Sequence, residues 1–203
     1  VAGLARELGL WIVAGTVPLR VPGQPRVAAA CLVFDAGGRR VARYDKIHLF
    51  DVAIPGREER YQESASVRPG QEPVCVATPA GRLGLAVCYD LRFPELFRRL
   101  VDLGAGWFCL PSAFTAPTGR AHWETLLRAR AIENFCHVVA PAQSGFHENG
   151  RETHGDSMIV DCWGRVLARL PRGSGVVVAE IDLVRQREVR QNFPSLDHRR
   201  LAQ

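Results

Sequence analysis

The chain has 203 residues, of which 47% are hydrophobic and 23% are charged. This length and composition predict one globular domain, residues 1–203, with a sizeable core. The formal net charge is +5, but the 26 basic residues are interspersed with 21 acidic ones and form no extended tract. This pattern argues against a nucleic-acid partner. No apolar run reaches the length of a membrane span, so we expect no membrane insertion.

Strand-like and helix-like runs alternate along the chain, which predicts a layered α/β protein. The apolar spacing before the first strand predicts a short amphipathic helix at the N-terminus. Three pairs of strands flank glycine-containing turns, at 36–38, 79–81 and 162–164, and are expected to form hairpins. The predicted strands are 10–15, 27–35, 39–46, 74–78, 83–88, 107–110, 136–140, 157–161, 165–170 and 176–181, and the longer helices are 94–103 and 120–134.

Two stretches between these elements are expected to be loops. Residues 51–70 are rich in charge, proline and glycine, and long loops in compact domains are often functional, so we expect them to rim a site. A surface loop without function is the alternative. Residues 143–155 contain His147 and His154, whose spacing does not match a metal site. We therefore expect neither a metal nor another cofactor.

The six cysteines stand singly, without the paired spacing of a zinc site or a disulfide framework. We therefore expect a reducing compartment and a cytoplasmic protein. Four of them sit in apolar strand-like runs and are expected to be structural. These four are Cys31, Cys75, Cys109 and Cys136.

Cys88 differs from these four because a polar turn and a helix follow it. A thiol at a strand end can face a cleft, and the backbone N–H groups of the next turn, such as that of Tyr89, can bind an oxyanion. Cys88 is therefore the candidate nucleophile, and a small core residue is the alternative. Arg92 is a candidate for attracting an acidic substrate, but it could instead pair with Glu95.

Lys46 and Glu124 are the other candidates for the site. Lys46 ends a predicted hairpin, and an ammonium beside Cys88 would lower the pKa of the thiol and bind an oxyanion. A surface ion pair with a neighbouring aspartate is the alternative for Lys46. Glu124 lies beside the apolar stripe of helix 120–134, where an ion pair with Arg128 one turn later is the alternative.

Together and in order, these segments resemble the nitrilase superfamily of carbon-nitrogen hydrolases. The resemblance implies an α-β-β-α sandwich that usually dimerises, so we expect a homodimer or a higher homo-oligomer. It also implies a triad of glutamate, lysine and cysteine with a further glutamate near the site. The matching segments are 44–49, 84–95, 111–114, 122–124 and 161–164, which span nearly the whole chain.

Within the superfamily, the segments 51–56, 127–134 and 198–200 look most like amidases that hydrolyse deaminated glutathione. The resemblance therefore implies cleavage of the C–N bond of a small linear amide, through a cysteine acyl-thioester and with release of ammonia. Two alternatives stay open. One is an ω-amidase for 2-oxo acid amides, and the other is a catalytically silent nitrilase-like binding protein.

The resemblance assigns a role to each candidate residue. Cys88 matches the nucleophile, Lys46 the triad lysine and Glu124 the further glutamate, which would orient Lys46 or the substrate nitrogen. The Tyr89 N–H would hold the oxyanion together with Lys46.

The general base of the triad has no match in the chain. Glu7 is the only acidic residue before Asp35, but its neighbours form an ordinary amphipathic helix, so we reject Glu7 as the base. We expect the chain, which starts at Val1 without methionine, to be a fragment that lacks the first strand and the catalytic glutamate. Acylation by such a fragment would be slow.

Four further positions bear on the pocket or depart from the superfamily pattern. Phe114 and Thr115 are candidate pocket residues, with core packing as the alternative for Phe114. Asp156 stands where close relatives commonly carry histidine, and Cys162 stands where proline is usual. The first departure could alter substrate choice if its loop lines the pocket.

Overall fold

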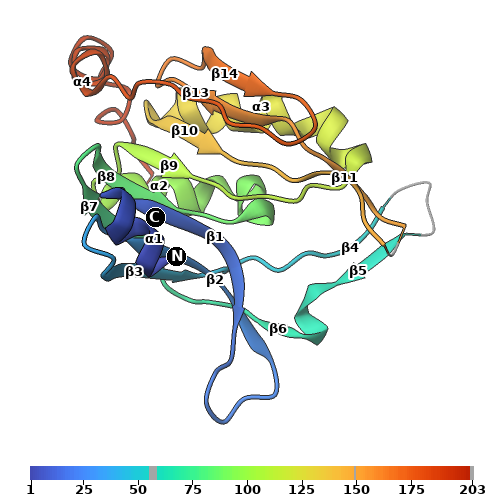
Figure 1. The fold of residues 1–203 in the computed structure, drawn as a ribbon. Helices are drawn as coiled ribbons and strands as arrows, with labels where there is room; N and C mark the ends of the chain where they lie inside the picture. Colours follow the sequence, from blue (N-terminus) through green and yellow to red (C-terminus); the bar gives the residue numbers. More distant parts are fainter. Residues whose placement is uncertain (55–58, 149, 202–203) are drawn as a thin grey trace.

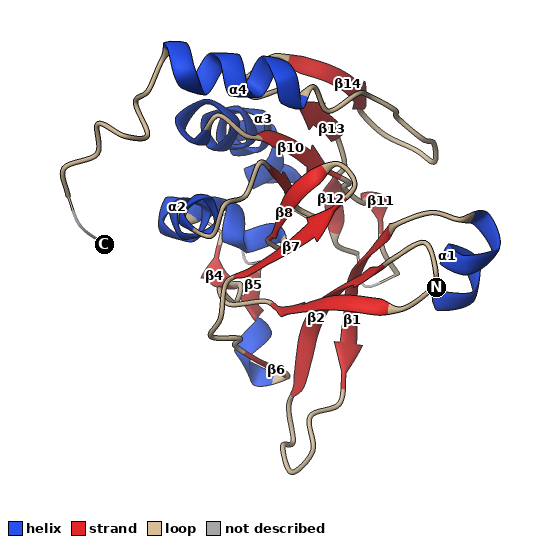
Figure 2. Cartoon of the chain, turned by 90° about the vertical axis from the view of Figure 1, so that its left-hand side faces the viewer, coloured by secondary structure: helices blue, strands red, loops and turns tan. Residues whose placement is uncertain are grey.

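The computed structural model describes residues 1–54, 59–148 and 150–201. Two β-sheets face each other across a common core, and two helices cover the outer face of the larger sheet (Figures 1 and 2). This arrangement agrees with the layered α/β protein that the residue pattern predicts and with the sandwich that the resemblance implies. Among the described residues, no helix combines the length and the apolar character that crossing a membrane requires.

The smaller sheet is built from the first half of the chain. Its strands β1, β2 and β3 are antiparallel neighbours in that order, and β6 pairs with β2 in parallel. Helix α1 (Ala2–Leu8) lies against the β2–β3 turn, where Arg6 Nε donates to the Gly37 carbonyl at 3.3 Å. The strand bounds are β1 Ile12–Leu19, β2 Val27–Phe34, β3 Arg40–Asp45 and β6 Val67–Arg68.

The larger sheet has six strands in the order β14-β13-β10-β9-β8-β7. The three central strands, β8, β9 and β10, are parallel neighbours, and antiparallel strands flank them on both sides. The bounds are β7 Val74–Thr78, β8 Gly81–Leu85, β9 Trp107–Cys109, β10 His137–Ala140, β13 Ser157–Val160 and β14 Val166–Leu170.

Helices α2 (Pro94–Asp102) and α3 (Ala116–Asn134) cover the larger sheet. Gly84 of β8 permits the close approach of α2, because a Cβ atom there would lie only 3.1 Å from Leu100 Cδ1. It would lie 3.0 Å from Phe108 Cδ1 on the neighbouring strand. A larger residue at this position would push the helix away from the sheet.

Helix α4 (Leu183–Asn192) covers the C-terminal end of α3. The Arg190 guanidinium donates to the carbonyls of Asn134 and Phe135, each at 3.2 Å. Gln186 donates to the Phe135 carbonyl at 2.7 Å. These bonds satisfy carbonyls that the end of a helix leaves without a partner.

The core joins the inner faces of both sheets to the helices. Apolar burial is the main stabilising contribution to such a layered fold. The largest fully buried apolar side chains are Trp123, Tyr44, Phe97, Phe108, Leu83, Leu85, Leu91, Leu100, Leu110, Leu127 and Met158.

Most of the predicted elements are confirmed, including all three hairpins and the strand–helix alternation. The predicted strand 176–181 is wrong. Residues 175–182 form no strand, and Val176 and Val178 are 87% and 83% exposed. An apolar run becomes a strand only where a partner edge is available, and no described strand pairs with this segment.

The two predicted loops contain more structure than expected. Within residues 51–70, β4 (Asp51–Ala53) pairs with β5 (Arg60–Gln62), and a short 3-10 helix, η1 (Glu63–Ala65), follows. Within residues 143–155, β11 (Ser144–Phe146) pairs with β12 (Glu152–His154). Residues 55–58 of the first loop lie outside the described residues.

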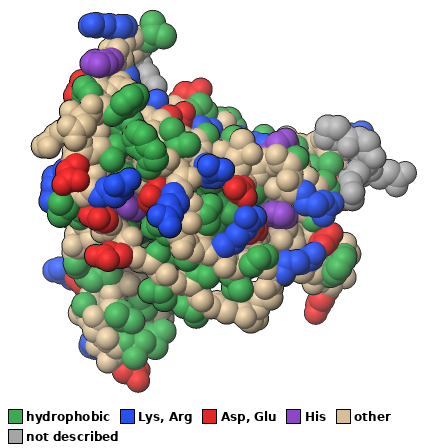
Figure 3. Space-filling model, turned by 90° about the horizontal axis from the view of Figure 1, so that it is seen from above, with side chains coloured by type: hydrophobic (Ala, Val, Ile, Leu, Met, Phe, Trp, Pro, Cys, Tyr) green, Lys and Arg blue, Asp and Glu red, His purple; other side chains and the backbone are tan. Residues whose placement is uncertain are grey.

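Side chains of both charges are spread over the face shown in Figure 3, which is seen from above the view of Figure 1. Lys and Arg side chains lie there among acidic and apolar ones. The positive net charge therefore does not gather into one continuous patch on this face.

Candidate active site

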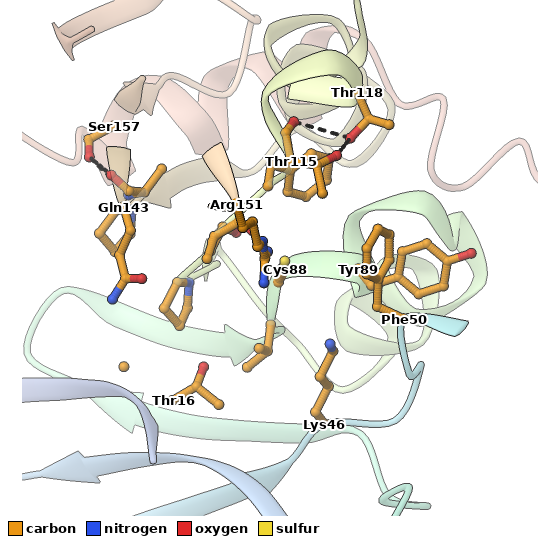
Figure 4. A pocket seen from close by; sticks show the side chains of 18 of the residues that line it. Thr16, Lys46, Phe50, Cys88, Tyr89, Thr115, Thr118, Gln143, Arg151 and Ser157 are labelled. Atoms are coloured by element: carbon orange, nitrogen blue, oxygen red, sulfur yellow. Dashed lines mark hydrogen bonds between the residues drawn. The ribbon is translucent and has the colours of Figure 1, made fainter. Parts of the chain in front are cut away.

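The chain forms a cavity of about 1090 Å³ where the two sheets meet (Figure 4). Strand β1 of the smaller sheet contributes Val13 and Thr16, and β9 of the larger sheet contributes Cys109. The β5–η1 segment and residues next to β11 and β12 add to the wall, so residues 60–63 of the stretch 51–70 line the cavity. The charged residues of the lining are Lys46, Arg60, Glu63, Arg92 and Arg151.

Cys88 lines this cavity at the start of a 3-10 turn, η2 (Cys88–Arg92), rather than within strand β8. Its φ of 50° is in the left-handed region, which cysteine rarely adopts. The Cys88 N–H donates to the Pro111 carbonyl at 3.1 Å, which holds this unusual backbone. Strained backbone at a cavity is typical of functional residues.

The surroundings of Cys88 act on its thiol in opposite directions. Burial raises the pKa of Cys88, while the Lys46 ammonium and the Ala113 N–H lower it. The four cysteines expected to be structural are fully or partly buried, as predicted, and only Cys109 of that group also lines the cavity. Cys88 is therefore the cysteine whose thiol combines access to the cavity with a nearby cation.

Lys46 follows strand β3 and points into the same cavity as Cys88 (Figure 4). It is 4% exposed, so it is not the surface lysine of the alternative interpretation. Its Nζ pairs with Glu63 Oε2 at 2.5 Å, and the same oxygen accepts the Phe50 N–H at 2.7 Å. Glu63 thus fixes the position of the Lys46 ammonium and supplies its counter-charge at the cavity wall.

The structure does not bring Glu124 to this site, which corrects the expectation that Glu124 orients Lys46. Its carboxylate lies 3.0 Å from Arg169 Nη1 and 3.6 Å from Arg128 Nη1, and it does not line the cavity. The ion pair with Arg128 was the alternative interpretation. Glu63 occupies the place beside Lys46 that we assigned to Glu124.

The expected substrate-binding residues all line the cavity, and so does Tyr89. Tyr89 is the second residue of η2, directly after Cys88. Phe114 is 4% exposed and packs on Trp123 with ring centroids 4.9 Å apart, so it belongs to both the core and the wall. Thr115 occupies the N-cap position of α3, and its Oγ1 lies 2.7 Å from Thr118 Oγ1.

Arg92 is half-buried and its guanidinium lies between aromatic rings. It lies 5.3 Å from the Phe114 ring centroid and 5.9 Å from that of Tyr89. Its Nη1 contacts His122 Nδ1 at 3.2 Å, and no ion pair with Glu95 is present among the described residues. Burial lowers the pKa of Arg92. A desolvated cation at a cavity wall is suited to bind an anionic group.

Sequence reasoning missed Glu63, Arg60 and Arg151 as lining residues. The only signal was their position in the two loop segments, of which one was expected to rim the site. Neither His147 nor His154 lines the cavity. His147 Nε2 lies 3.0 Å from Thr153 Oγ1, and His154 Nε2 lies 3.8 Å from Asp156. No cluster of three or more potential metal ligands is present among the described residues.

The two departures from the superfamily pattern lie outside the cavity lining. Asp156 has a φ of 66°, and its carboxylate receives two hydrogen bonds from Arg169, at 2.6 and 2.8 Å. Cys162 is fully buried. Ser157, next to Asp156, does line the cavity, so the loop that carries the first departure reaches the site.

Comparison with known proteins identifies the class to which this fold and cavity belong. The family model for carbon-nitrogen hydrolases matches residues 1–191. The chain therefore belongs to the carbon-nitrogen hydrolase family, and it is a hydrolase.

Curated relatives and solved structures support this assignment over nearly the whole chain. The chain is 47% identical to a deaminated glutathione amidase of Synechocystis over 199 residues, which are 97% of this chain and 73% of the relative. It is 48% identical to the human deaminated glutathione amidase over 205 residues, covering 97% of this chain and 61% of the relative. The crystal structure of the C. elegans NitFhit protein superimposes with a TM-score of 0.89 at 46% identity, covering 98% of this chain and 48% of that one.

Proposed function

We propose that this chain is an amidase that hydrolyses deaminated glutathione with Cys88 as the nucleophile. The observation that carries the proposal is the thiol of Cys88 in a cavity that also holds the buried Lys46 ammonium. The name shared by the similar curated relatives supports the substrate. A cavity of about 1090 Å³ is large enough for a tripeptide-sized molecule.

In this mechanism the Cys88 sulfur attacks the carbonyl carbon of the amide. The carbonyl oxygen becomes an oxyanion, which the Lys46 ammonium and the Tyr89 N–H stabilise. Glu63 holds Lys46 in place, the role that we had expected of Glu124. The C–N bond then breaks, the amine leaves with a proton, and water hydrolyses the thioester to a carboxylic acid and the free thiol.

The leaving group follows from the chemistry of the proposed substrate. Each amide nitrogen of glutathione carries a carbon substituent, so cleavage of its C–N bond releases an amine. The release of ammonia that we expected applies only to primary amides, such as those cleaved by an ω-amidase. For deaminated glutathione, the expected amine is cysteinylglycine.

Arg92 supplies the proposed recognition of a substrate carboxylate. Deaminated glutathione is anionic, and the Arg92 guanidinium contacts His122 and two rings rather than a carboxylate among the described residues. A charge-assisted hydrogen bond to such a cation is stronger than one between neutral groups. Phe114 and Thr115 shape the wall beside it.

A base must take the proton of Cys88, because burial raises the pKa of this thiol. Among the described lining residues, Glu63 is the only carboxylate, and Lys46 already engages it. The resemblance assigns this step to a triad glutamate that has no match in residues 1–203. The experiments below therefore use the protein at its natural full length.

The test is the release of cysteinylglycine from deaminated glutathione, compared with ammonia release from 2-oxoglutaramate. We expect turnover of the tripeptide, a covalent acyl-enzyme that mass spectrometry detects, and loss of both in Cys88→Ala. Preference for 2-oxoglutaramate would replace the proposal with an ω-amidase. Equal turnover by Cys88→Ala, or none by the wild type, would refute it.

The resemblance also supports a homodimer, which we propose as the form of the active protein. Sedimentation velocity of the full-length protein tests this proposal. A single species with the mass of one chain at micromolar concentration would contradict it.

A further inference from the structure

A fully buried carboxylate lies beneath the site. Asp90 is the third residue of η2, it is 0% exposed, and it does not line the cavity. Its Oδ2 accepts the Tyr44 hydroxyl at 2.7 Å and the Val87 N–H at 2.8 Å. Its Oδ1 accepts the His48 N–H at 3.1 Å and lies 2.7 Å from His48 Nδ1.

These partners come from the two segments that carry the reacting groups. Val87 and Asp90 flank Cys88 in the η2 turn, whereas Tyr44 and His48 flank Lys46 by two residues on either side. One carboxylate therefore links the segment of the proposed nucleophile to the segment of the proposed oxyanion-binding lysine. The two segments are more than 40 residues apart in the sequence.

Further contacts make this link rigid. The His48 ring stacks on Phe93, the residue after η2, with centroids 3.7 Å apart and planes 6° apart. The Tyr44 hydroxyl also accepts the Ile47 N–H at 3.2 Å. Burial and the neighbouring Asp90 raise the pKa of Tyr44 far above its ordinary value, so this hydroxyl remains a donor throughout the pH range of activity.

Burying a carboxylate is costly, and a sequence retains one where its several acceptor sites have a use. His48 is the only described residue that could contribute a positive charge in direct contact with Asp90. Hydrogen bonds from three donors in two segments, together with the His48 Nδ1 contact, compensate for the lost hydration instead. An apolar residue would fill the space but could not fix the two segments relative to each other.

We propose that Asp90 is a positioning residue that sets the distance and direction between Cys88 Sγ and Lys46 Nζ. It touches neither the cavity nor the substrate, and it acts through Val87 on one side and through Tyr44 and His48 on the other. This inference rests on the proposed roles of Cys88 and Lys46. It adds a residue that neither the sequence motifs nor the cavity lining identifies as functional.

The experiment compares Asp90→Asn and Tyr44→Phe with the wild type in the full-length protein. Asparagine has one acceptor oxygen, so either the donors on Oδ1 (His48) or those on Oδ2 (Tyr44 and Val87) lose their acceptor. We expect kcat on deaminated glutathione to fall roughly 10- to 100-fold in Asp90→Asn, since a small misplacement of reacting groups has effects of this size. Tyr44→Phe removes one bond, and we expect a smaller fall, by about 3- to 10-fold.

The rate of Cys88 alkylation by iodoacetamide is measured as a function of pH. If Asp90 only stabilised the fold, the midpoint of this pH profile would not change in the variants. The Lys46 ammonium lowers the pKa of Cys88, so displacing Lys46 raises the midpoint of the alkylation profile. We expect this upward shift in Asp90→Asn and, to a smaller extent, in Tyr44→Phe. If Asp90→Asn does not fold, Tyr44→Phe and His48→Asn carry the test.

Asp161→Asn is the matched control. Asp161 is also buried, and its Oδ1 accepts the N–H groups of Trp163 and Arg165, each at 2.8 Å, but it lies outside the cavity lining. We expect wild-type kcat and midpoint from this variant. Wild-type values in Asp90→Asn and Tyr44→Phe, while Cys88→Ala is inactive, would overturn the positioning role alone. An active Cys88→Ala would overturn the proposed function itself.

Discussion

Two ionic clusters built around glutamates show how location decides what a carboxylate does in this molecule. In the inner cluster, Glu63 pairs with Lys46, which is 4% exposed at the cavity wall. In the outer cluster, Glu124 pairs with Arg169 and Arg128, and its side chain is 38% exposed. The first pair is shielded from water, whereas the second is largely screened by it.

Sequence motifs and spatial position point to different glutamates as the one that acts in the site. Glu124 belongs to a motif next to an apolar stripe, and yet its partners are arginines outside the cavity. Glu63 belongs to no motif that we identified, and yet its oxygen accepts bonds from both Lys46 and the Phe50 N–H. The predictions below test this contrast.

The largest effect is expected from Glu63→Gln. The amide keeps the shape of the side chain and an acceptor oxygen beside Lys46, but it removes the charge that fixes the direction of the ammonium, so we expect kcat to fall by about 100-fold. Steady-state kinetics on deaminated glutathione measures this. A kcat within twofold of the wild type would show that the inner cluster does not support catalysis.

The same variant has a defined effect on the Cys88 thiol. The Glu63 carboxylate raises the pKa of Cys88, and removing it also leaves the Lys46 ammonium without its counter-charge. Both changes lower the pKa, so alkylation by iodoacetamide should reach its half-maximal rate at a lower pH. Glu124→Gln is the control, and an unshifted profile in Glu63→Gln would contradict the assignment.

Arg92→Gln should have the next largest effect, because it removes a cavity cation without a carboxylate partner among the described residues. We expect kcat/KM for deaminated glutathione to fall about 10-fold, mostly through KM. An uncharged amide such as butyramide, if it is turned over, should be affected far less. An equal loss on charged and uncharged amides would exclude a role in recognising the carboxylate.

Asp156→Asn should weaken the outer cluster with little effect on the chemistry. Asp156 is buried and accepts two bonds from Arg169, so we expect a loss of about 1–3 kcal/mol in the free energy of unfolding. Denaturant titration measures this loss. A fall in kcat larger than the fall caused by Glu63→Gln would reverse the contrast between the clusters.

Glu124→Gln should have the smallest effect. Both of its arginine partners are more than 40% exposed, so we expect stability to change by less than about 0.5 kcal/mol. We expect kcat to stay within twofold of the wild type. A large loss of activity would show that Glu124 acts in the site and would contradict its placement outside the cavity.

The sequence predicted those parts of the fold that depend on local pattern. Most strands, the hairpin turns that contain glycine and the start of the helix at Pro94 lie where expected, because each depends on neighbouring residues. The strand expected at 176–181 was wrong because strand formation also needs a partner edge, which no window of sequence contains.

The candidate site was predictable to the extent that each residue belongs to a short motif. Cys88 and Lys46 were found in this way and share the cavity. Glu63 was not found, because its approach to Lys46 depends on how the chain turns back through β4, β5 and η1. The link through Asp90 was missed for a similar reason, since its partners come from a segment more than 40 residues away.

The left-handed backbone of Cys88 implies a trade-off between stability and reactivity at a single residue. Glycine adopts a φ of 50° without strain, whereas a side chain there costs about 1 kcal/mol. Selection for stability alone would therefore favour glycine at position 88, at the start of the turn. A cysteine that persists there makes the fold slightly less resistant to heat than its own geometry allows.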